Sequence, residues 1–417
     1  MKKADDSGAL VVVLGWNYST SLGIVRSLGM AGFTVDLYFI ARERGGSRIT
    51  ASSRYLRHTT EHVGRDDEGI IADLENKYGN ESSRCVLVPT DDYSASLLDR
   101  YCDRLSPRFL MPHMGAGEAG AITRMMDKTI QSDLASAYGL QVVPTQMIDL
   151  PEKGEIRIPD GIRYPCFVKP RMSLDGRKTE MRKNNNEEEL RTHLSLMRNT
   201  RANRTVIVQD YIDIDEEYSI SGLCLDQTVI LPALLQRLCV GKHERGVTIV
   251  GKLVPLEETI RFVPQLKDML KSLHFTGLFC IDLFRSGDRF YFNEMNLRCA
   301  GSVYGFVKAG ANLPAVLVKS LLGNPWLPGE TEVTCGKTFF YDKVGWEDLV
   351  LGLCSRQEFN HYLQMSDYTF MKDPDDPAPG EVLYAEMERQ RRKNQIKRMF
   401  PIPARIMGRI LSFLRNR

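Results

Sequence analysis

The segment 275–302 constrains this chain most, because it reads as two apolar strands that flank a tight turn and carry oxygen donors. With the turn centred on Gly287, Asp282 is expected to pair with Phe292 across the hairpin. Glu294 then becomes the diagonal neighbour of Asp282 on the same face. A slip of one residue in this register would send the two carboxylates to opposite faces, so the prediction depends on the turn.

Asn296 lies two residues beyond Glu294 and therefore points the same way, and Arg298 follows it. Two carboxylates and an amide supply the hard oxygen ligands that Mg²⁺ prefers. An arginine beside such ligands suits the binding of a nucleotide triphosphate together with its metal ion. The alternative is an ordinary edge hairpin whose charges are solvated.

Composition places the chain among ordinary soluble proteins of two to four domains. Its 417 residues are 43% hydrophobic and 26% charged, close to globular averages. No apolar run approaches the ~20 residues of a membrane span, and the N-terminus lacks a signal-peptide cleavage pattern. Nine cysteines form no CxxC pair, which argues against a disulfide framework or a zinc site and favours the reducing cytosol.

The order of elements predicts an α/β fold. Leu10–Leu14 reads as a buried strand, Ser19–Leu28 as a helix and Thr34–Ile40 as a second strand. This βαβ opening implies a parallel sheet. Residues 1–115 are therefore expected to form a Rossmann-like domain.

Further elements are expected along the rest of the chain. Helices are predicted over Ile70–Tyr78, Ser94–Leu105, Arg124–Tyr138, Ile260–Leu273 and Asn312–Leu322, and strands over Cys85–Pro89, Cys166–Lys169, Thr205–Gln209, Tyr218–Leu225 and Val229–Leu235. Beyond about Gly323 the chain is expected to be irregular and rich in proline.

Four further motifs precede the hairpin in a meaningful order. They are Met126-Asp127-Lys128 at a helix start, the strand end Phe167-Val168-Lys169-Pro170, the segment 208–217, and the polar loop 173–178. With the hairpin, these motifs resemble the ATP-grasp superfamily over roughly residues 10–325. The resemblance implies two ATP-grasp subdomains of α+β type, 116–204 and 205–325, and a C-terminal extension over 326–417.

The resemblance also implies how ATP is held. Lys128 and Lys169 correspond to the two lysines that bind ATP phosphates, a role that suits a compact ammonium. Ser173 and Gly176 belong to the loop that resembles the flap over the phosphates, where backbone N–H groups can form an anion nest. For each of these residues the alternative is an ordinary surface lysine or a surface loop.

Adenine and ribose are expected to meet the segment 209–217. Gln209 stands where the family often has glutamate, and its carbonyl can accept from the adenine amino group. Asp210 and the main chain of Tyr211 and Ile212 follow in the hinge. Glu217, or Glu216 without an insertion, matches the ribose acceptor; solvated acids at a strand end are the alternative.

Asp282, Glu294 and Asn296 correspond to the family's ligands for two Mg²⁺ ions, with Mn²⁺ as an alternative ion. Arg298 matches the arginine of the family's metal-site signature and, with Lys169, is the expected catalytic residue. Some members carry an arginine two residues before the metal aspartate, where this chain has Cys280. One phosphate contact is therefore missing or comes from elsewhere. Cys299 is read as a packed thiol rather than a nucleophile.

The resemblance implies an ADP-forming ligase that joins a carboxylate to an amine through an acyl phosphate. The segments GWNYSTSLGIVRSLG, VPTDDYSASLLDRY and NEMNLRCAGS further resemble the D-aspartate-ligase branch. That branch implies an amino-acid carboxylate and an amine on a peptidoglycan or other cell-envelope precursor.

The basic C-terminus fits such a substrate. From Arg389 to Arg417 there are ten Lys/Arg and no acidic residue, which leaves 45 basic and 53 acidic residues, a net charge of −8, for the rest. Apolar residues of 405–417 fall largely on one helical face, the pattern of an interfacial helix on anionic lipid. The protein is thus expected in the cytoplasm, docked on the inner membrane face. A helix packed on the protein's own acidic body is the alternative, and nothing indicates nucleic-acid binding.

Two other functions stay open. One is a nucleotide-binding module without ligase activity, for which Gln209 and Cys280 leave room. The other is an NAD-type oxidoreductase, suggested by the N-terminal βαβ unit and by Asp36 about twenty residues after Gly15. The chain, however, lacks the GxGxxG pattern of that class of enzymes.

Overall fold

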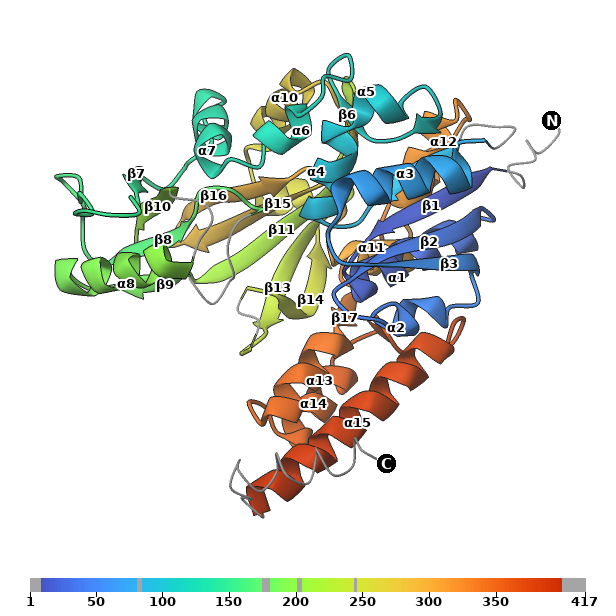
Figure 1. The fold of residues 1–417 in the computed structure, drawn as a ribbon. Coiled ribbons are helices and arrows are strands. Elements are labelled where there is room, and N and C mark those ends of the chain that lie inside the picture. The colour runs from blue at the N-terminus through green and yellow to red at the C-terminus, as the bar shows by residue number, and fades with distance from the viewer. Residues whose placement is uncertain (1–8, 81–84, 175–180, 201–204, 244–245, 400–417) are drawn as a thin grey trace.

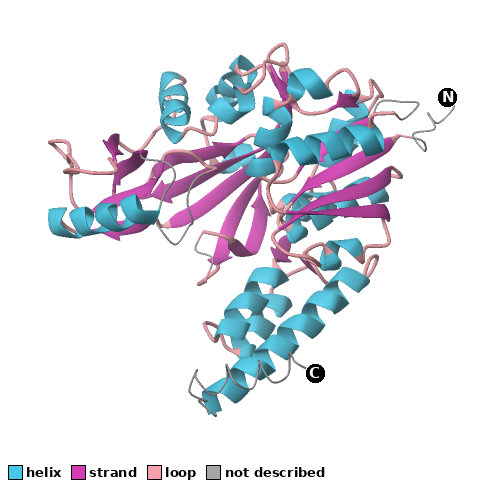
Figure 2. Cartoon of the chain, viewed as in Figure 1, coloured by secondary structure: helices cyan, strands magenta, loops and turns pink. Residues whose placement is uncertain are grey.

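The computed structural model describes residues 9–80, 85–174, 181–200, 205–243 and 246–399. Figure 1 shows three parts: an N-terminal α/β unit at the right, a central sheet that reaches a smaller sheet at the left, and a helical C-terminal part at the bottom. The predicted α/β class is confirmed, and Figure 2 shows how the helices flank the two larger sheets.

The N-terminal unit is a parallel sheet with the strand order β3-β2-β1-β4-β5. Its strands are β1 (Leu10–Gly15), β2 (Thr34–Ala41), β3 (Leu56–Val63), β4 (Cys85–Pro89) and β5 (Phe109–Leu110), and its helices are α1 (Tyr18–Met30), α2 (Arg48–Ala51), α3 (Asp67–Tyr78), α4 (Asp92–Arg100) and α5 (Cys102–Leu105). Alternate side chains of β1 pack on α1 on one face and on α3 and α4 on the other. Both faces are therefore buried, as parallel sheets require.

The central sheet has nine strands in the order β16-β15-β11-β13-β14-β17-β18, with β12 beside β11 and β6 beside β15. Its strands are β6 (His113–Met114), β11 (Glu216–Leu225), β12 (Thr228–Ile230), β13 (Leu234–Val240), β14 (Thr248–Val254), β15 (Phe275–Ser286), β16 (Arg289–Asn296), β17 (Thr338–Phe340) and β18 (Tyr368–Thr369). The single strand predicted over Val229–Leu235 is wrong: β12 and β13 are separate, and Pro232, which cannot donate to a ladder, lies between them.

Helices cover both faces of this sheet. On one face lie α6 (Ala121–Arg124), α7 (Lys128–Ala137), α9 (Leu256–Thr259) and α10 (Val263–Ser272), and on the other α11 (Val303–Lys308) and α12 (Leu313–Leu321). The single helix predicted over Arg124–Tyr138 is interrupted, because Asp127 forms a β-bridge to Met172. This bridge places the start of α7 beside the chain that leaves the small sheet.

The small sheet is antiparallel, with the order β7-β10-β8-β9. Its strands are β7 (Thr145–Asp149), β8 (Cys166–Pro170), β9 (Arg182–Asn184) and β10 (Thr205–Asp210), and α8 (Glu187–Thr200) packs on one face. Val168 and Val208 point into that core, so Lys169 and Gln209 point to the other face. The small sheet thus offers a polar face away from α8.

The irregular C-terminal region predicted beyond Gly323 is wrong. A 3₁₀ turn (Pro328–Thr331) is followed by β17, α13 (Asp342–Leu351), α14 (Arg356–Gln364), β18 and α15 (Ala378–Met399). Trp346 of α13 contacts Phe359 of α14 and Tyr384 of α15, so an aromatic cluster holds the helices together. The predicted basic helix over 405–417 lies outside the described residues.

Arg26 of α1 anchors this part to the N-terminal unit. Its buried guanidinium pairs with Asp376, from Nε to Oδ2 at 2.9 Å, and donates to the carbonyls of Phe370 and Met371. Its side chain is fully buried and also lies over the ring of Tyr304. A buried charge held by this many acceptors fixes the segment 370–376 against α1.

Candidate functional site

The predicted hairpin forms, but its register is reached in a different way. The turn residues are Gly287 and Asp288, since Ser286 pairs with Arg289, and Gly287 has the positive φ of 57° that the turn requires. This register pairs Leu283, not Asp282, with Phe292. Continued unchanged, it would place the two carboxylates on opposite faces.

A β-bulge corrects the register at the point that matters. Between Leu283 and Asp282 the pairing shifts by one residue, which leaves Asn293 as the extra residue and pairs Asp282 directly with Glu294. Cys280 then pairs with Asn296. The expected diagonal contact is therefore wrong, while the expectation of one shared face holds because of the bulge.

The two carboxylates and the amide form a compact donor set. Asn296 Nδ2 donates to Glu294 Oε1 at 3.3 Å, and Asp282 stands opposite Glu294. Hard oxygen donors of this kind fit Mg²⁺ or Mn²⁺. Within the ranges that the structure describes, no three His, Cys, Asp or Glu side chains gather into a metal-type group; the donor set here is two carboxylates and one amide.

Two lysines from different elements face this donor set. Lys128, at the start of α7, donates to Ser173 Oγ at 3.0 Å and lies 3.7 Å from Glu294 Oε2. Lys169, from β8, donates to the bulge residue Asn293 at 3.0 Å. The bulge thus pairs Asp282 with Glu294, and its extra residue, Asn293, accepts the hydrogen bond from Lys169.

The two cations set the ionisation of Glu294. Burial raises the pKa of Glu294, but the charges of Lys128 and Lys169 outweigh this effect and lower it to about 2. Burial lowers the pKa of Lys169 to about 8, against the opposing attraction of Glu294. At neutral pH both groups are charged, which is the state that a metal ion and a phosphate require.

We expect nucleotide affinity to fall as the pH rises above about 8, because Lys169 then loses the proton that pairs with phosphate. One linked proton weakens ADP binding by up to about tenfold per pH unit. Calorimetric titration with ADP between pH 7 and 9.5 measures this slope. In Lys169→Arg the charge persists across this range, so the slope should flatten; an equal slope in both proteins would contradict the assignment.

Arg298 joins the site to the N-terminal unit. Its guanidinium forms a two-point ion pair with Asp92 at the start of α4, with Nε–Oδ1 at 2.8 Å and Nη2–Oδ2 at 3.1 Å. Burial opposes the charge, but Asp92 holds the pKa of Arg298 above its usual range. Asp92 was missed in the sequence, although the pair Asp91-Asp92 comes one residue after the end of the buried strand β4 and was a visible signal.

Arg237 of β13 was also missed. It pairs with Glu217 (Nη1–Oε2, 2.9 Å) and with Asp282 (Nη2–Oδ1, 2.5 Å). A guanidinium therefore reaches the metal-type aspartate from β13, whereas Cys280 occupies the position on β15 itself. No local sequence pattern predicts this contact, because β13 and β15 meet β11 from opposite sides.

The hinge residues fall on two faces. Gln209 shares the outward face with Lys169 and donates to Thr145 Oγ1 at 2.8 Å. Asp210 instead forms an ion pair with Arg163. The N–H of Tyr211 donates to the carbonyl of Pro165, so Tyr211 can offer adenine only its carbonyl oxygen. Ile212 lies in the segment between β10 and β11, outside both strands, and its role stays a prediction.

Of the two candidate ribose acceptors, only Glu217 shares the face of Asp282, since Ser219 pairs with Asp282 and Glu217 lies two residues away. Glu216 turns to the opposite face and pairs with Arg285 at 2.7 Å. Ser173 lies beside Lys128, while Gly176 and the rest of the predicted phosphate flap lie outside the described residues. These cofactor-binding roles stay predictions.

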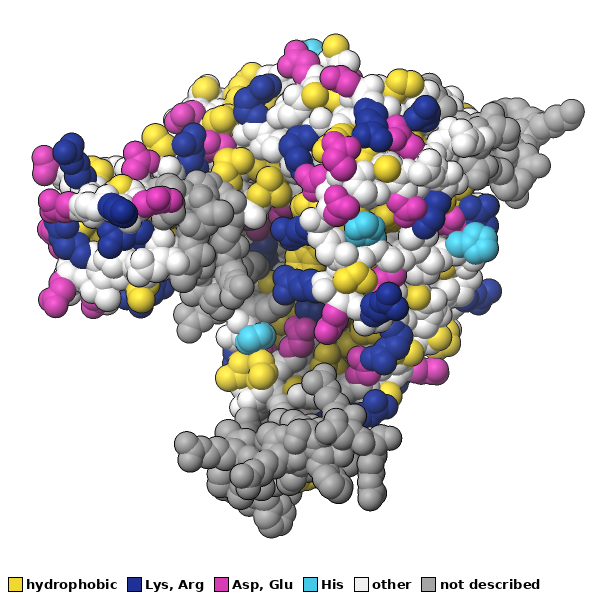
Figure 3. All heavy atoms as spheres, viewed as in Figure 1, with side chains coloured by type: hydrophobic (Ala, Val, Ile, Leu, Met, Phe, Trp, Pro, Cys, Tyr) yellow, Lys and Arg dark blue, Asp and Glu magenta, His cyan; other side chains and the backbone are white. Residues whose placement is uncertain are grey.

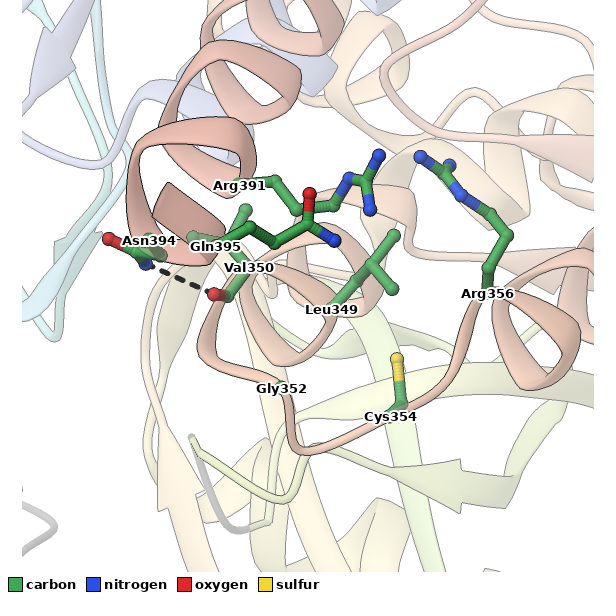
Figure 4. Close-up of a pocket in the computed structure, with 8 residues that line it drawn as sticks. All are labelled: Leu349, Val350, Gly352, Cys354, Arg356, Arg391, Asn394 and Gln395. Carbon is green, nitrogen blue, oxygen red and sulfur yellow. Dashed lines mark hydrogen bonds between the residues drawn. The ribbon is translucent and has the colours of Figure 1, made fainter. Parts of the chain in front are cut away.

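Figure 3 shows a hollow between the small-sheet part at the left and the N-terminal unit at the right, with Lys and Arg side chains along its right edge. A second pocket, of about 300 Å³, lies among α13, α14 and α15 (Figure 4). Arg356 and Arg391 at this pocket share Glu388, and Asn394 donates to the carbonyl of Val350. It is built from none of the residues of the candidate site.

Residues 140–302 match the family model described as "ATP-grasp domain". The chain contains an ATP-grasp domain. This domain spans the small sheet and the hairpin, so it includes Lys169, Arg237 and the three oxygen donors.

Curated relatives match over less of the chain. The formate-dependent phosphoribosylglycinamide formyltransferase of Corynebacterium glutamicum is 26% identical over 140 residues, 32% of this chain and 34% of that relative. The chain thus matches about a third of that relative's length.

Solved structures share the fold over most of the chain. The N5-carboxyaminoimidazole synthetase of Staphylococcus aureus, solved with ADP, has a TM-score of 0.61 at 17% identity and covers 85% of this chain and 86% of its own. The L-amino acid ligase of Bacillus licheniformis has a TM-score of 0.58 at 14% identity, covering 80% and 79%. The fold shared with these structures therefore extends beyond residues 140–302 into the N-terminal unit.

Asp36 does not support the oxidoreductase alternative. It lies early in β2, opposite Val12, rather than at the carboxyl end of the strand where dinucleotides bind. Its carboxylate is held by two hydrogen bonds from Arg57, at 2.9 and 2.8 Å. Cys299 is buried and burial raises its thiol pKa, in line with a packed side chain. Across the described ranges, no helix has the length and apolarity of a membrane span.

Proposed function

We propose that this protein is an ADP-forming ligase that activates a carboxylate with ATP and joins it to an amine. The observation that carries the proposal is the meeting of two lysines with the paired carboxylates: Lys169 from the small sheet and Lys128 from α7 face Glu294, which stands opposite Asp282. Cations and hard oxygen donors on facing elements suit a triphosphate and its metal ions.

The residues then have separate tasks. Asp282, Glu294 and Asn296 would hold two Mg²⁺ ions, which neutralise phosphate charge when bound. Lys128 and Lys169 orient the phosphates, and Gln209, Tyr211 and Glu217 orient adenine and ribose.

Arg298, fixed by Asp92, would hold the transferred phosphoryl group or the substrate carboxylate. The substrate carboxylate attacks the γ-phosphate and ADP leaves. The amine nitrogen then attacks the acyl carbon, phosphate leaves, and the amine gives up a proton. Positioning and charge neutralisation suffice for this sequence, so no protein nucleophile is needed.

The substrates are proposed more narrowly. The solved relatives include a ligase of amino acids, and the D-aspartate-ligase motifs point to an amino-acid carboxylate and an amine on a peptidoglycan or other envelope precursor. Such a substrate fits a cytoplasmic protein that docks on the inner membrane face through its basic C-terminus.

A screen for ADP release tests the proposal. The full-length protein is incubated with Mg·ATP, D- and L-amino acids as carboxylate donors, and envelope precursors as amine acceptors. We expect ADP release that requires both substrates and yields a product lacking one water relative to them. Nucleotide binding with no ADP release from any pair would favour the alternative of an ATP-binding module without ligase activity.

We further expect deletion of residues 404–417, which lie outside the described residues, to release the protein from vesicles that contain anionic lipid. Each lost basic residue costs roughly 1 kcal/mol near such a surface. Vesicle sedimentation measures binding, and ADP release with soluble substrates should be unchanged. Equal sedimentation before and after deletion would contradict membrane docking by the tail.

A further inference from the structure

Arg237 occupies the candidate metal site in an unusual way. Its side chain is only 10% exposed and bridges Glu217 and Asp282, and Nη1 also donates to the carbonyl of Gly246 at 2.9 Å. Nε is buried and, within the described ranges, has no hydrogen-bond partner. A buried cation with an unused donor is costly, so its persistence beside a metal-type ligand calls for a functional reason.

The chain's own charges already balance one another at this site. Its cations and carboxylates pair as follows: Arg237 with Asp282 and Glu217, Lys128 with Glu294, and Arg298 with Asp92. A bare divalent ion that takes Asp282 Oδ1 displaces Arg237, which leaves the buried guanidinium with Glu217 and the carbonyl of Gly246 as its remaining partners. A bare polyphosphate can take Arg237 only by leaving Asp282 uncompensated. Either step alone breaks a buried ion pair at high cost.

A metal–polyphosphate complex avoids both costs. The metal ion takes the carboxylates while the phosphates take the guanidinium, so each charge exchanges one partner for another. Guanidinium suits this exchange, because its planar donors match phosphate as well as carboxylate. The unused Nε gains an acceptor in the same movement.

We propose that Arg237 is a positioning residue that caps Asp282 and makes this site select the divalent cation–nucleoside polyphosphate complex over either component alone. The proposal rests on the proposed function, since it assigns Asp282 to the metal. It implies that metal and nucleotide affinities are coupled, and coupling of binding free energies is reciprocal.

The test uses the full chain and two variants, Arg237→Gln and the control Arg285→Gln. Arg285 also pairs with a glutamate of β11, but on the opposite face of the sheet. Electron paramagnetic resonance measures binding of Mn²⁺ alone, and calorimetry measures binding of Mn²⁺ with the ATP analogue AMP-PNP. We expect Arg237→Gln to bind free Mn²⁺ roughly tenfold tighter and the Mn²⁺·AMP-PNP complex roughly tenfold more weakly, as loss of a charge-assisted hydrogen bond implies. The control should change neither.

The two affinities are expected to change in opposite directions in Arg237→Gln. A merely structural role of Arg237 would instead weaken the binding of both free Mn²⁺ and the Mn²⁺·AMP-PNP complex. Unchanged or weaker Mn²⁺ binding in folded Arg237→Gln, or an equal gain in the control, overturns the proposal. Should Arg237→Gln fail to fold, Arg237→Lys replaces it: the shorter ammonium bridges the two carboxylates less well, so free Mn²⁺ should again bind more tightly. If AMP-PNP binds to no form of the protein, the proposed function fails, while the Mn²⁺ measurement still decides whether Arg237 caps Asp282.

Discussion

Glu294→Gln should reduce ADP formation by at least about 10²–10³-fold, the scale for loss of a preorganised charge in an active site. Glu294 stands opposite Asp282 and is the carboxylate that two lysines hold ionised, with a pKa of about 2. A neutral amide keeps the shape but loses the charge that holds the metal ions. Initial rates of ADP release, with folding checked by circular dichroism, measure the effect.

The matched control is Glu388→Gln. Glu388 also lies between two cations, Arg356 and Arg391, and also has a pKa of about 2. It belongs to the helical C-terminal part, away from the ATP-grasp domain, so its loss should leave ADP formation within about twofold of the unmodified protein. Full turnover in Glu294→Gln would refute its metal role, and an equal loss in both variants would point to general destabilisation.

Arg26→Met should loosen the C-terminal part from the N-terminal unit by about 3–5 kcal/mol, the usual cost of removing one partner of a buried ion pair. The loss leaves the buried carboxylate of Asp376 with Ser53 and the backbone N–H of Arg54 as its remaining donors. The carbonyls of Phe370 and Met371 lose their donor as well. Hydrogen exchange of the backbone over 366–384 measures the local opening directly.

Arg48→Gln supplies the comparison, because Arg48 also links the N-terminal unit to the C-terminal part, through Glu386 of α15. Its side chain is 62% exposed, and exposed pairs contribute only about 0–1 kcal/mol. Protection over 366–384 should therefore drop in Arg26→Met and stay nearly unchanged in Arg48→Gln. Equal protection in the two variants would show that the buried pair does not hold the segment.

The hairpin shows which features of the candidate site can be predicted from the sequence. Alternating apolar residues and Gly287 predicted the two strands, and the positions of Asp282 and Glu294 predicted a shared face. The turn contains Gly287 as expected, but the pairing beside it is shifted by one residue, and the bulge at Asn293 returns Asp282 and Glu294 to one face. No local pattern marks this bulge, because the contact that uses it comes from Lys169, 124 residues away in sequence.

Residues that reach the site from remote elements were not predicted from the sequence, for the same reason. Arg237 meets Asp282, and Asp92 meets Arg298, only through strand order and domain packing, which a single sequence does not encode locally. The C-terminal helices were not predicted from the sequence for a different reason. In α15 Leu383 is fully buried, but exposed and half-buried polar residues dominate the helix, so its stability comes from packing rather than from a visible apolar stripe.

We propose that Asp282, Glu294 and Asn296 hold metal ions against a triphosphate bound by Lys128 and Lys169. A crystal structure with Mn²⁺ and AMP-PNP, read by anomalous scattering, would show whether these residues meet the ions and the phosphates. We predict Mn²⁺ peaks within coordination distance of Asp282 and Glu294, and phosphate oxygens on both lysine ammonium groups. A nucleotide bound instead at the carboxyl edge of β1 and β4, or an absence of Mn²⁺ peaks at these carboxylates, would contradict the account.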